Sequence, residues 1–148
     1  MQLHYSPDEI KAACNILDAC ISHIYHQRML EVRNLDTAQQ IEKYINDNIA
    51  WDLSIEHLCA HFSVSRAELY QIFHTSFNSS VADYIRSKRI SMAEQMIRTT
   101  AMQISEIASN VGFYDYNYFS KVFHRKFGCS PREYRKKLES GSEAADKK

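Results

Sequence analysis

The chain has 148 residues, 45% of them hydrophobic and 24% charged, with only three glycines and two prolines. This composition fits one compact domain or two very small ones, and it excludes collagen-like sequence and glycine-rich phosphate loops. Eighteen basic residues balance eighteen acidic ones, so the total charge gives no sign of a nucleic-acid or membrane partner. Because the sequence has no long apolar run and no apolar leader, we expect a soluble, cytoplasmic protein.

The first part of the chain predicts an amphipathic helix. Apolar residues recur at steps of 4, 3, 4 and 3 from Ile10 to Ile24, which indicates a helix from about residue 8 to residue 30. The pattern breaks at residues 33–36, where Asp36 and Gln39 resemble a capping box that opens a new helix. We therefore expect a helical extension over residues 1–36, followed by a separate domain.

The last ten residues, 139–148, are small, polar and charged. Such a segment cannot bury enough apolar surface to repay the entropy of ordering it. We expect a disordered tail there.

An internal repeat appears when the chain is laid against itself with an offset of 50 residues, which slips to 49 upstream of Ser65. The matching pairs are Ser65 with Asp115, Leu69 with Phe119, Ile72 with Val122, Phe73 with Phe123, His74 with His124, Phe77 with Phe127, Ser80 with Ser130 and Tyr84 with Tyr134. One structural unit therefore occurs twice, with an extra residue in the turn of the second copy.

Each copy predicts a short helix, a tight turn, a second helix and a closing helix. A small residue, Cys59 or Ala108, lets the second helix cross the first closely. Four residues later, Ser63 or Gly112 permits the turn. This is the geometry of a helix-turn-helix.

Between the two copies, residues 79–99 predict one continuous helix without glycine or proline. About 18 helical residues span roughly 27 Å. Two recognition helices at the ends of such a linker could reach successive major-groove segments about 34 Å apart on one face of DNA.

The second copy, ISEIASNVGFYDYNYFSKVFHRKFGCSPREYR, resembles the signature of AraC/XylS-type transcriptional regulators. The matching residues are Ile104, Ile107, Ala108, Gly112, Phe113, Tyr118, Phe119, Phe123, Gly128, Ser130, Pro131, Tyr134 and Arg135. With the first copy and the linker segment from Arg89 to Ala93, the resemblance covers residues 37–138. The first copy departs slightly, with Cys59 where alanine is usual.

The resemblance implies an all-α, seven-helix DNA-binding domain over residues 37–138, made of two helix-turn-helix subdomains joined by the long linker helix. Aligned on the motif, the base-reading positions of the family fall on Ala67, Tyr70 and Gln71 in the first copy, and on Tyr116, Asn117, Ser120 and Lys121 in the second. Tyr118 fits a buried position of the family pattern, and we expect Tyr116 to face outward.

The chemistry of these side chains agrees with base reading. Gln71 and Asn117 can pair with adenine through two hydrogen bonds, and Lys121 can donate to guanine. Phosphate contacts are expected from helix N-termini and basic side chains. They comprise Ser54, Ser65, Arg66, Arg86, Arg125 and Lys126.

The neutral total charge hides an asymmetry along the chain. Residues 37–85 carry two basic and six acidic side chains, whereas residues 121–138 carry seven basic and one acidic. We therefore expect the second helix-turn-helix to anchor DNA electrostatically and the first to bind weakly and conditionally.

Other kinds of site are weaker interpretations. His57 and His61 have a spacing that can bind zinc, but Cys59 points to another side of the helix and no fourth ligand is evident. We expect no metal and no cofactor, and a metal-responsive regulator stays as one alternative. No combination of serine, histidine and acidic residues supports catalysis, so we expect no enzyme.

The apolar stripe of the N-terminal helix must bury on the DNA-binding domain, on a second copy of the chain, or on a sensory domain absent from this chain. We favour a homodimer through residues 8–30. In a rival hypothesis the protein is an interaction module, in which this helix carries the function and the helix-turn-helix units are only a scaffold.

The sequence thus predicts a sequence-specific transcriptional regulator that reads two adjacent major-groove segments of double-stranded DNA. We expect an activator that works in the cytoplasm at the nucleoid. Its expected partners are promoter DNA and RNA polymerase, with no membrane.

Overall fold

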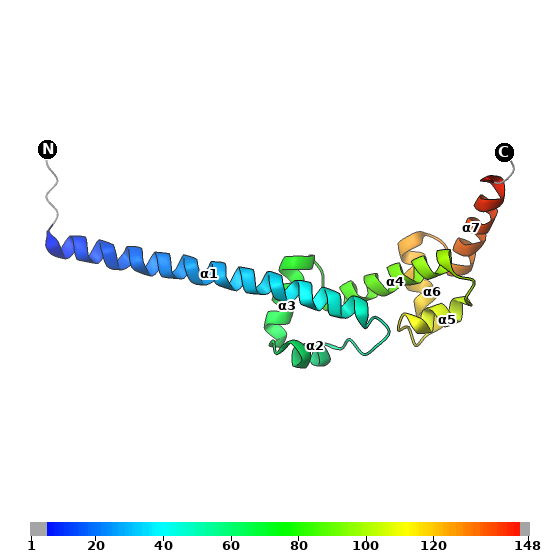
Figure 1. Cartoon of the computed structure of the whole chain (residues 1–148), viewed down its shortest axis with the longest axis horizontal. Coiled ribbons are helices and arrows are strands. Elements are labelled where there is room, and N and C mark those ends of the chain that lie inside the picture. The colour runs from blue at the N-terminus through cyan, green and yellow to red at the C-terminus, as the bar shows by residue number, and fades with distance from the viewer. Residues whose placement is uncertain (1–5, 146–148) are drawn as a thin grey trace.

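The computed structural model describes residues 6–145, and every regular element in that range is an α-helix. The predicted all-α class is confirmed. The molecule is elongated, with the two ends of the chain at opposite ends of its long axis (Figure 1). No helix within the described range is long and apolar enough to cross a membrane.

Helix α1 (Pro7–Asp47) begins one residue before the predicted start and runs without interruption for 41 residues. The predicted helix break at residues 33–36 is therefore wrong. The side chains of Thr37 and Gln40 each bind a residue four positions earlier, at 2.9 and 3.0 Å. Residues four apart lie on one face of a helix, so these polar groups interact along a continuous helix and do not cap a new one.

The end of α1 packs with α2 (Ile55–Phe62), α3 (Arg66–Phe77) and the start of α4 (Val81–Thr99) to form the first subdomain. Its buried side chains are Ala38, Ile41, Ile45, Ile49, Leu53, Leu58, Leu69, Ile72, Phe73, Val81 and Ile85. The predicted linker helix, α4, is thus also a wall of the first core.

The second subdomain is built from the rest of α4 with α5 (Ile104–Asn110), α6 (Tyr116–Phe127) and α7 (Pro131–Ala145). Its buried side chains are Ile90, Ala93, Ile97, Ile104, Ile107, Ala108, Val111, Phe113, Phe119, Val122 and Phe123. Helix α4 therefore passes from one core into the other, with α3 and α6 packed near its two ends (Figure 1).

The predicted turns and caps are present in both copies. Ser63 has φ 53° and Gly112 has φ 85°, both in the left-handed region that a tight turn requires. The side chain of Ser65 caps α3, and that of Asp115 accepts a hydrogen bond from the backbone N–H of Asn117 at 2.8 Å. The repeat in the sequence is therefore a repeat in the fold.

Each closing helix is tied to the helix that opens its subdomain. Tyr84 Oη donates to Glu42 at 2.8 Å in the first subdomain, and Tyr134 Oη donates to Glu94 at 2.6 Å in the second. The two tyrosines are one of the repeated pairs. The end of α1 thus accepts a hydrogen bond from the closing helix of the first subdomain, and α4 accepts the equivalent bond from the closing helix of the second.

Helix α7 continues to Ala145, beyond the predicted boundary of the tail. The expectation of a disordered segment is therefore wrong for residues 139–145. Residues 146–148 lie outside the described part of the chain.

Glu42 offers a test of how α1 is held. Lys88 donates to its carboxylate at 2.6 Å, and this bond, followed by that from Tyr84, holds the pKa of Glu42 below its ordinary value of 4.5. A carboxyl whose pKa is lower in the folded chain stabilises the fold fully above its ordinary pKa, and this contribution is lost as pH falls. Glu42→Gln should lower the free energy of unfolding by about 1 kcal/mol at pH 7 and by less near pH 3.

Urea denaturation at the two pH values measures this difference. Glu139→Gln, on the exposed side of α7, removes the same charge elsewhere and should leave stability unchanged. An equal loss from Glu42→Gln at both pH values would contradict the ionic tie.

Candidate nucleic-acid interface

The two recognition helices present polar faces to solvent because their apolar residues enter the cores. In α3, Leu69, Ile72 and Phe73 are buried. The predicted base-reading residues Ala67, Tyr70 and Gln71 lie exposed on the other side. The helical spacing of the apolar positions therefore places these three residues as expected.

Helix α6 corrects one expectation. Asn117 and Lys121 are exposed as predicted. Tyr116 is half-buried against the core, with its ring centroid 6.1 Å from that of Phe119, while Tyr118 is 45% exposed. The orientations expected for the two tyrosines are therefore reversed.

The reason for the reversal is helical spacing. Tyr116 is three residues before the buried Phe119 and shares its face, whereas Tyr118 is about 100° away from that face. The same rule explains why Ser120, one residue after Phe119, is only half-buried. Tyr118 is the exposed aromatic residue of this helix, and the period of the apolar residues could have identified it.

The start of α3 is already occupied by local partners. Ser65 and Glu68 form a capping box, with the carboxylate of Glu68 accepting from the Ser65 backbone N–H at 2.8 Å. This bond lowers the pKa of Glu68, so the carboxylate stays charged. Arg66 forms an ion pair with Glu56. A phosphate at this end of α3 would meet two carboxylates and a neutralised arginine.

Three other residues predicted to contact phosphate also have partners within the chain. Ser54 caps α2 by accepting from the backbone N–H of His57 at 3.3 Å, and Arg86 pairs with Asp83. Lys126 donates to the side chain of Ser91 at 2.9 Å, back on α4.

Lys121 and Arg125 differ from these residues. Both are exposed on α6, and within residues 6–145 neither has a hydrogen-bonded or ionic partner. They are the cations of this helix that are ready to meet a phosphate or a base.

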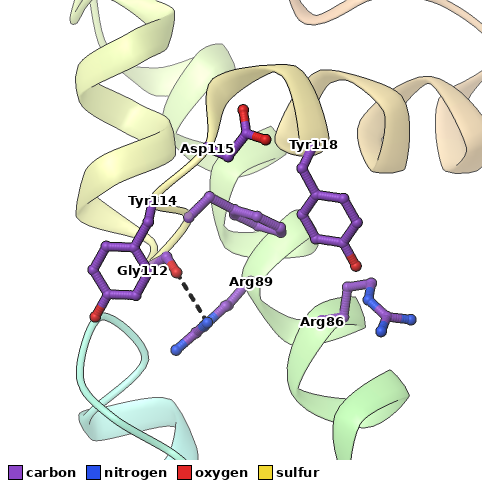
Figure 2. Close-up of a pocket in the computed structure, with 7 residues that line it drawn as sticks. Arg86, Arg89, Gly112, Tyr114, Asp115 and Tyr118 are labelled. Carbon is purple, nitrogen blue, oxygen red and sulfur yellow. Dashed lines mark hydrogen bonds between the residues drawn. The ribbon is translucent and has the colours of Figure 1, made fainter.

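A hollow of about 450 Å³ lies between α4 and the start of α6 (Figure 2). It is lined by Arg86, Arg89, Gly112, Phe113, Tyr114, Asp115 and Tyr118. Figure 2 shows the phenol of Tyr118 pointing toward Arg86. The hollow thus places a phenol and an arginine beside the recognition helix, where they can donate to DNA, while the Asp115 carboxylate opposes an anion there.

Arg89 joins the two subdomains. Its guanidinium donates to the carbonyls of Ile49 at 3.0 Å and Trp51 at 2.9 Å, both in the segment between α1 and α2. It also donates to the carbonyl of Gly112 at 2.9 Å, in the turn of the second helix-turn-helix (Figure 2). Burial lowers the pKa of Arg89. In the sequence Arg89 stands out only as part of the family pattern, because its three partners lie 23 to 40 residues away along the chain.

The histidines of α2 are engaged with Tyr44 of α1. Tyr44 Oη lies 2.8 Å from Nε2 of His57, and its ring stacks on that of His61 with centroids 4.1 Å apart. In the part of the chain that the structure describes, no three histidine, cysteine or acidic side chains gather to hold a metal ion.

A family model described as a helix-turn-helix domain matches residues 58–137, more than half of the chain. Over 104 residues the chain is 34% identical to the regulatory protein SoxS of Escherichia coli strain K12, covering 66% of this chain and 97% of SoxS. The chain belongs to the AraC family of transcriptional regulators. The resemblance noted in the sequence is therefore confirmed.

This AraC-family chain is also similar to a longer transcriptional activator and to a DNA-binding domain of known structure. It is 32% identical over 100 residues to the transcriptional activator RhaR of Cronobacter sakazakii, covering 68% of this chain but only 35% of RhaR. The chain thus spans about a third of the length of that relative. The DNA-binding domain of AdpA, solved in complex with a target DNA, has the same fold, with a TM-score of 0.67 at 20% identity, covering 70% of this chain and 93% of that domain.

Gly112 tests the joint formed by Arg89. A Cβ atom at Gly112 would lie 2.8 Å from Cζ of Arg89, whereas one at Gly128, which also has positive φ, would meet nothing within 4 Å. Gly128→Ala should cost about 1–2 kcal/mol from backbone strain alone. Gly112→Ala should cost at least about 1 kcal/mol more, because the displaced Arg89 loses hydrogen bonds. Urea denaturation compares the two, and equal losses would contradict this role of Arg89.

Proposed function

We propose that this chain regulates transcription by binding double-stranded DNA in a sequence-specific way, with α3 and α6 in two adjacent major-groove segments. The observation that carries this proposal is the pair of helix-turn-helix subdomains held on one helix, α4, each with a polar recognition face exposed. The DNA-binding domain of AdpA, which has this fold, has been solved in complex with a target DNA. The interaction-module and metal-responsive alternatives are not favoured.

In this proposal the side chains of α6 read bases directly. Asn117 can form two hydrogen bonds with adenine and Lys121 can donate to guanine. Ser120 is half-buried beside them, and Tyr118 takes the outward aromatic position that was expected for Tyr116. On α3, the exposed Ala67, Tyr70 and Gln71 are the corresponding set.

The local partners support an unequal division of labour between the two subdomains. Helix α6 ends in His124, Arg125 and Lys126, while α3 begins beside carboxylates. Because cations that replace phosphate counterions dominate affinity, α6 supplies most of the binding energy. Helix α3 adds sequence discrimination once the chain is on DNA.

We also propose that the chain is an activator that contacts RNA polymerase from a promoter and acts by binding alone, without catalysis. The activator role is supported by the similarity to RhaR, which is itself described as a transcriptional activator. Such a role places the chain in the cytoplasm, at the nucleoid. The exposed apolar stripe of α1 supports a homodimer through residues 8–30.

The direct experiment is selection of bound duplexes from a random library with the full chain. We expect one motif with two half-sites about 10 base pairs apart, because the recognition helices face the same side of DNA. Failure to enrich any motif, with binding that does not weaken in salt, would overturn the proposal.

Asn117→Ala and Lys121→Ala test base reading by α6. Each should weaken binding to the selected site by about 1–3 kcal/mol and relax specificity at one position. Asn110→Ala, at the exposed end of α5, is a control that should bind normally. Titrations on selected and random duplexes measure the effect, and equal losses on both would rule out direct readout by these residues.

Arg125→Ala tests phosphate contact. It should weaken binding to all sequences alike and reduce the slope of log affinity against log salt by about 1. Lys11→Ala removes the same charge on the exposed N-terminal part of α1 and should leave that slope unchanged. A loss confined to the selected site would instead make Arg125 a base-reading residue.

A further inference from the structure

Two large aromatic side chains are exposed at the junction between the subdomains. Trp51, in the segment between α1 and α2, is 73% exposed, and Tyr114, in the turn before α6, is 94% exposed. They come from different subdomains, yet both line one hollow of about 240 Å³ beside Arg89. Exposed apolar groups that gather at one place mark a surface that meets a partner, whereas scattered single ones do not.

The backbone beneath both rings is fixed by Arg89. Its guanidinium donates to the carbonyl of Trp51 itself and to that of Gly112, two residues before Tyr114, each at 2.9 Å. The backbone N–H of Trp51 donates to the carbonyl of Asn48 at 2.9 Å. The two rings therefore start from positions that are already held relative to each other, which lowers the entropy cost of binding one partner together.

The hollow beside these rings continues along one side of α4 toward α6. It shares Arg89 and Tyr114 with the hollow of Figure 2, which in turn shares Arg86 with a third hollow of about 270 Å³ that reaches Arg125. Figure 2 shows Tyr114 on one side of Arg89 and Tyr118 with Arg86 on the other. We call these three adjoining hollows the central groove.

In the proposed complex, the central groove faces the duplex. Its lining includes Ser54 and Arg86, which are expected to contact phosphate, and Tyr118, the outward aromatic residue of α6. It lies along α4, which has α3 and α6 packed near its two ends (Figure 1). On one face of DNA, the minor groove lies between successive major-groove segments. Trp51 and Tyr114 are therefore placed opposite that minor groove.

We propose that Trp51 and Tyr114 form an aromatic wedge against the minor groove between the two half-sites, and that the chain selects a deformable base step there. This inference rests on the proposed function and adds a determinant of sequence preference outside both recognition helices. Apolar side chains pressed into a minor groove partly unstack the base step that they meet. Pyrimidine–purine steps such as TA unstack more easily than others, so a preference arises without a hydrogen bond to any base edge.

The acidic side chains of the central groove favour the same kind of step. Asp52 accepts from the backbone N–H and the hydroxyl of Ser54 at 3.0 and 3.1 Å, and Asp115 accepts from the backbone N–H of Asn117. These donors are neutral, so neither interaction cancels the charge of its carboxylate. An A-tract narrows the minor groove and concentrates its negative potential, which the two carboxylates oppose. A stiff A-tract at the centre is thus disfavoured by charge as well as by stiffness.

The arginines of the central groove do not reverse this preference. Arg86 pairs with Asp83, and Arg89 donates to three backbone carbonyls. A narrow A-tract groove attracts arginines that are able to enter it. Because both guanidiniums already have partners, contact at the centre depends on the aromatic rings.

Trp51 is the only tryptophan of the chain, so its fluorescence reports this contact directly. Titration of the full chain with the duplex selected from the random library should lower the emission. It should also protect the indole from quenching by acrylamide, because a side chain that is 73% exposed becomes covered. A duplex that binds while Trp51 stays as open to acrylamide as in the free chain would overturn the wedge.

Two duplexes with the same half-sites and different centres test the preference. One carries a TA step midway between the half-sites, and the other carries an A-tract. The natural chain should bind the TA duplex about tenfold more tightly. Trp51→Ala and Tyr114→Ala should each bind the two duplexes with nearly equal affinity. Both substitutions keep the backbone carbonyls that Arg89 binds, so the joint between the subdomains is retained.

Three control variants separate the wedge from other effects. Tyr114→Phe should keep the preference, because the ring acts and the hydroxyl does not. Leu138→Ala removes an exposed apolar side chain of α7 outside the central groove and should change neither affinity nor preference. Asn117→Ala should weaken binding to both duplexes by the same factor, because Asn117 acts in the major groove. A preference that survives both Trp51→Ala and Tyr114→Ala would overturn the inference.

The same titrations separate this inference from the proposed function. Equal binding of the natural chain to the TA and A-tract duplexes, with an affinity that falls as salt rises, would overturn the wedge and leave the DNA-binding function standing. Absence of salt-dependent binding to any duplex would overturn both. If Trp51→Ala and Tyr114→Ala weakened binding to both duplexes without changing the ratio of the two affinities, the rings would make only a general contact, and the proposed preference would be wrong.

Discussion

The guanidinium of Arg89 is the joint on which the arrangement of this molecule depends. The two subdomains have separate cores, and α4 leaves one core and enters the other at this residue. Arg89 donates three hydrogen bonds, two to carbonyls of the first subdomain, Ile49 and Trp51, and one to the carbonyl of Gly112 in the second. Successive major-groove segments have a fixed separation and orientation on DNA, so two recognition helices can meet both only if their relative position is held. Gly112 lacks a Cβ at the place where the guanidinium must pass.

The duplication did not produce two equal halves. Both subdomains keep the same caps, turns and tyrosine–glutamate ties. Their recognition helices differ in charge, because the arginine at the start of α3 is paired while Lys121 and Arg125 on α6 have no partner within the described residues. The shared features stabilise the fold, and the differing ones face solvent, where sequence can change at little cost to stability.

Prediction from sequence succeeded where a local rule acts alone. Helical spacing identified the buried faces of α3 and α6, and serine, aspartate and glycine marked the caps and turns. The errors came where two rules competed. At residues 33–36 a capping pattern suggested a break, yet the helix continues because those polar side chains bond along it. For Tyr116 and Tyr118 the family pattern predicts the opposite of what the spacing from Phe119 dictates, and the spacing decides which ring is buried.

The sequence by itself determined the fold class, the repeat, the family and the charge asymmetry, because each depends on residue type and spacing along the chain. Only the tertiary structure decided which cations are free, how Arg89 connects the subdomains, and that α1 continues unbroken into the first subdomain. These properties depend on residues that are distant in sequence, such as Ile49 and Gly112 around Arg89. No local sequence pattern predicts these contacts, because they form only when the helices pack together.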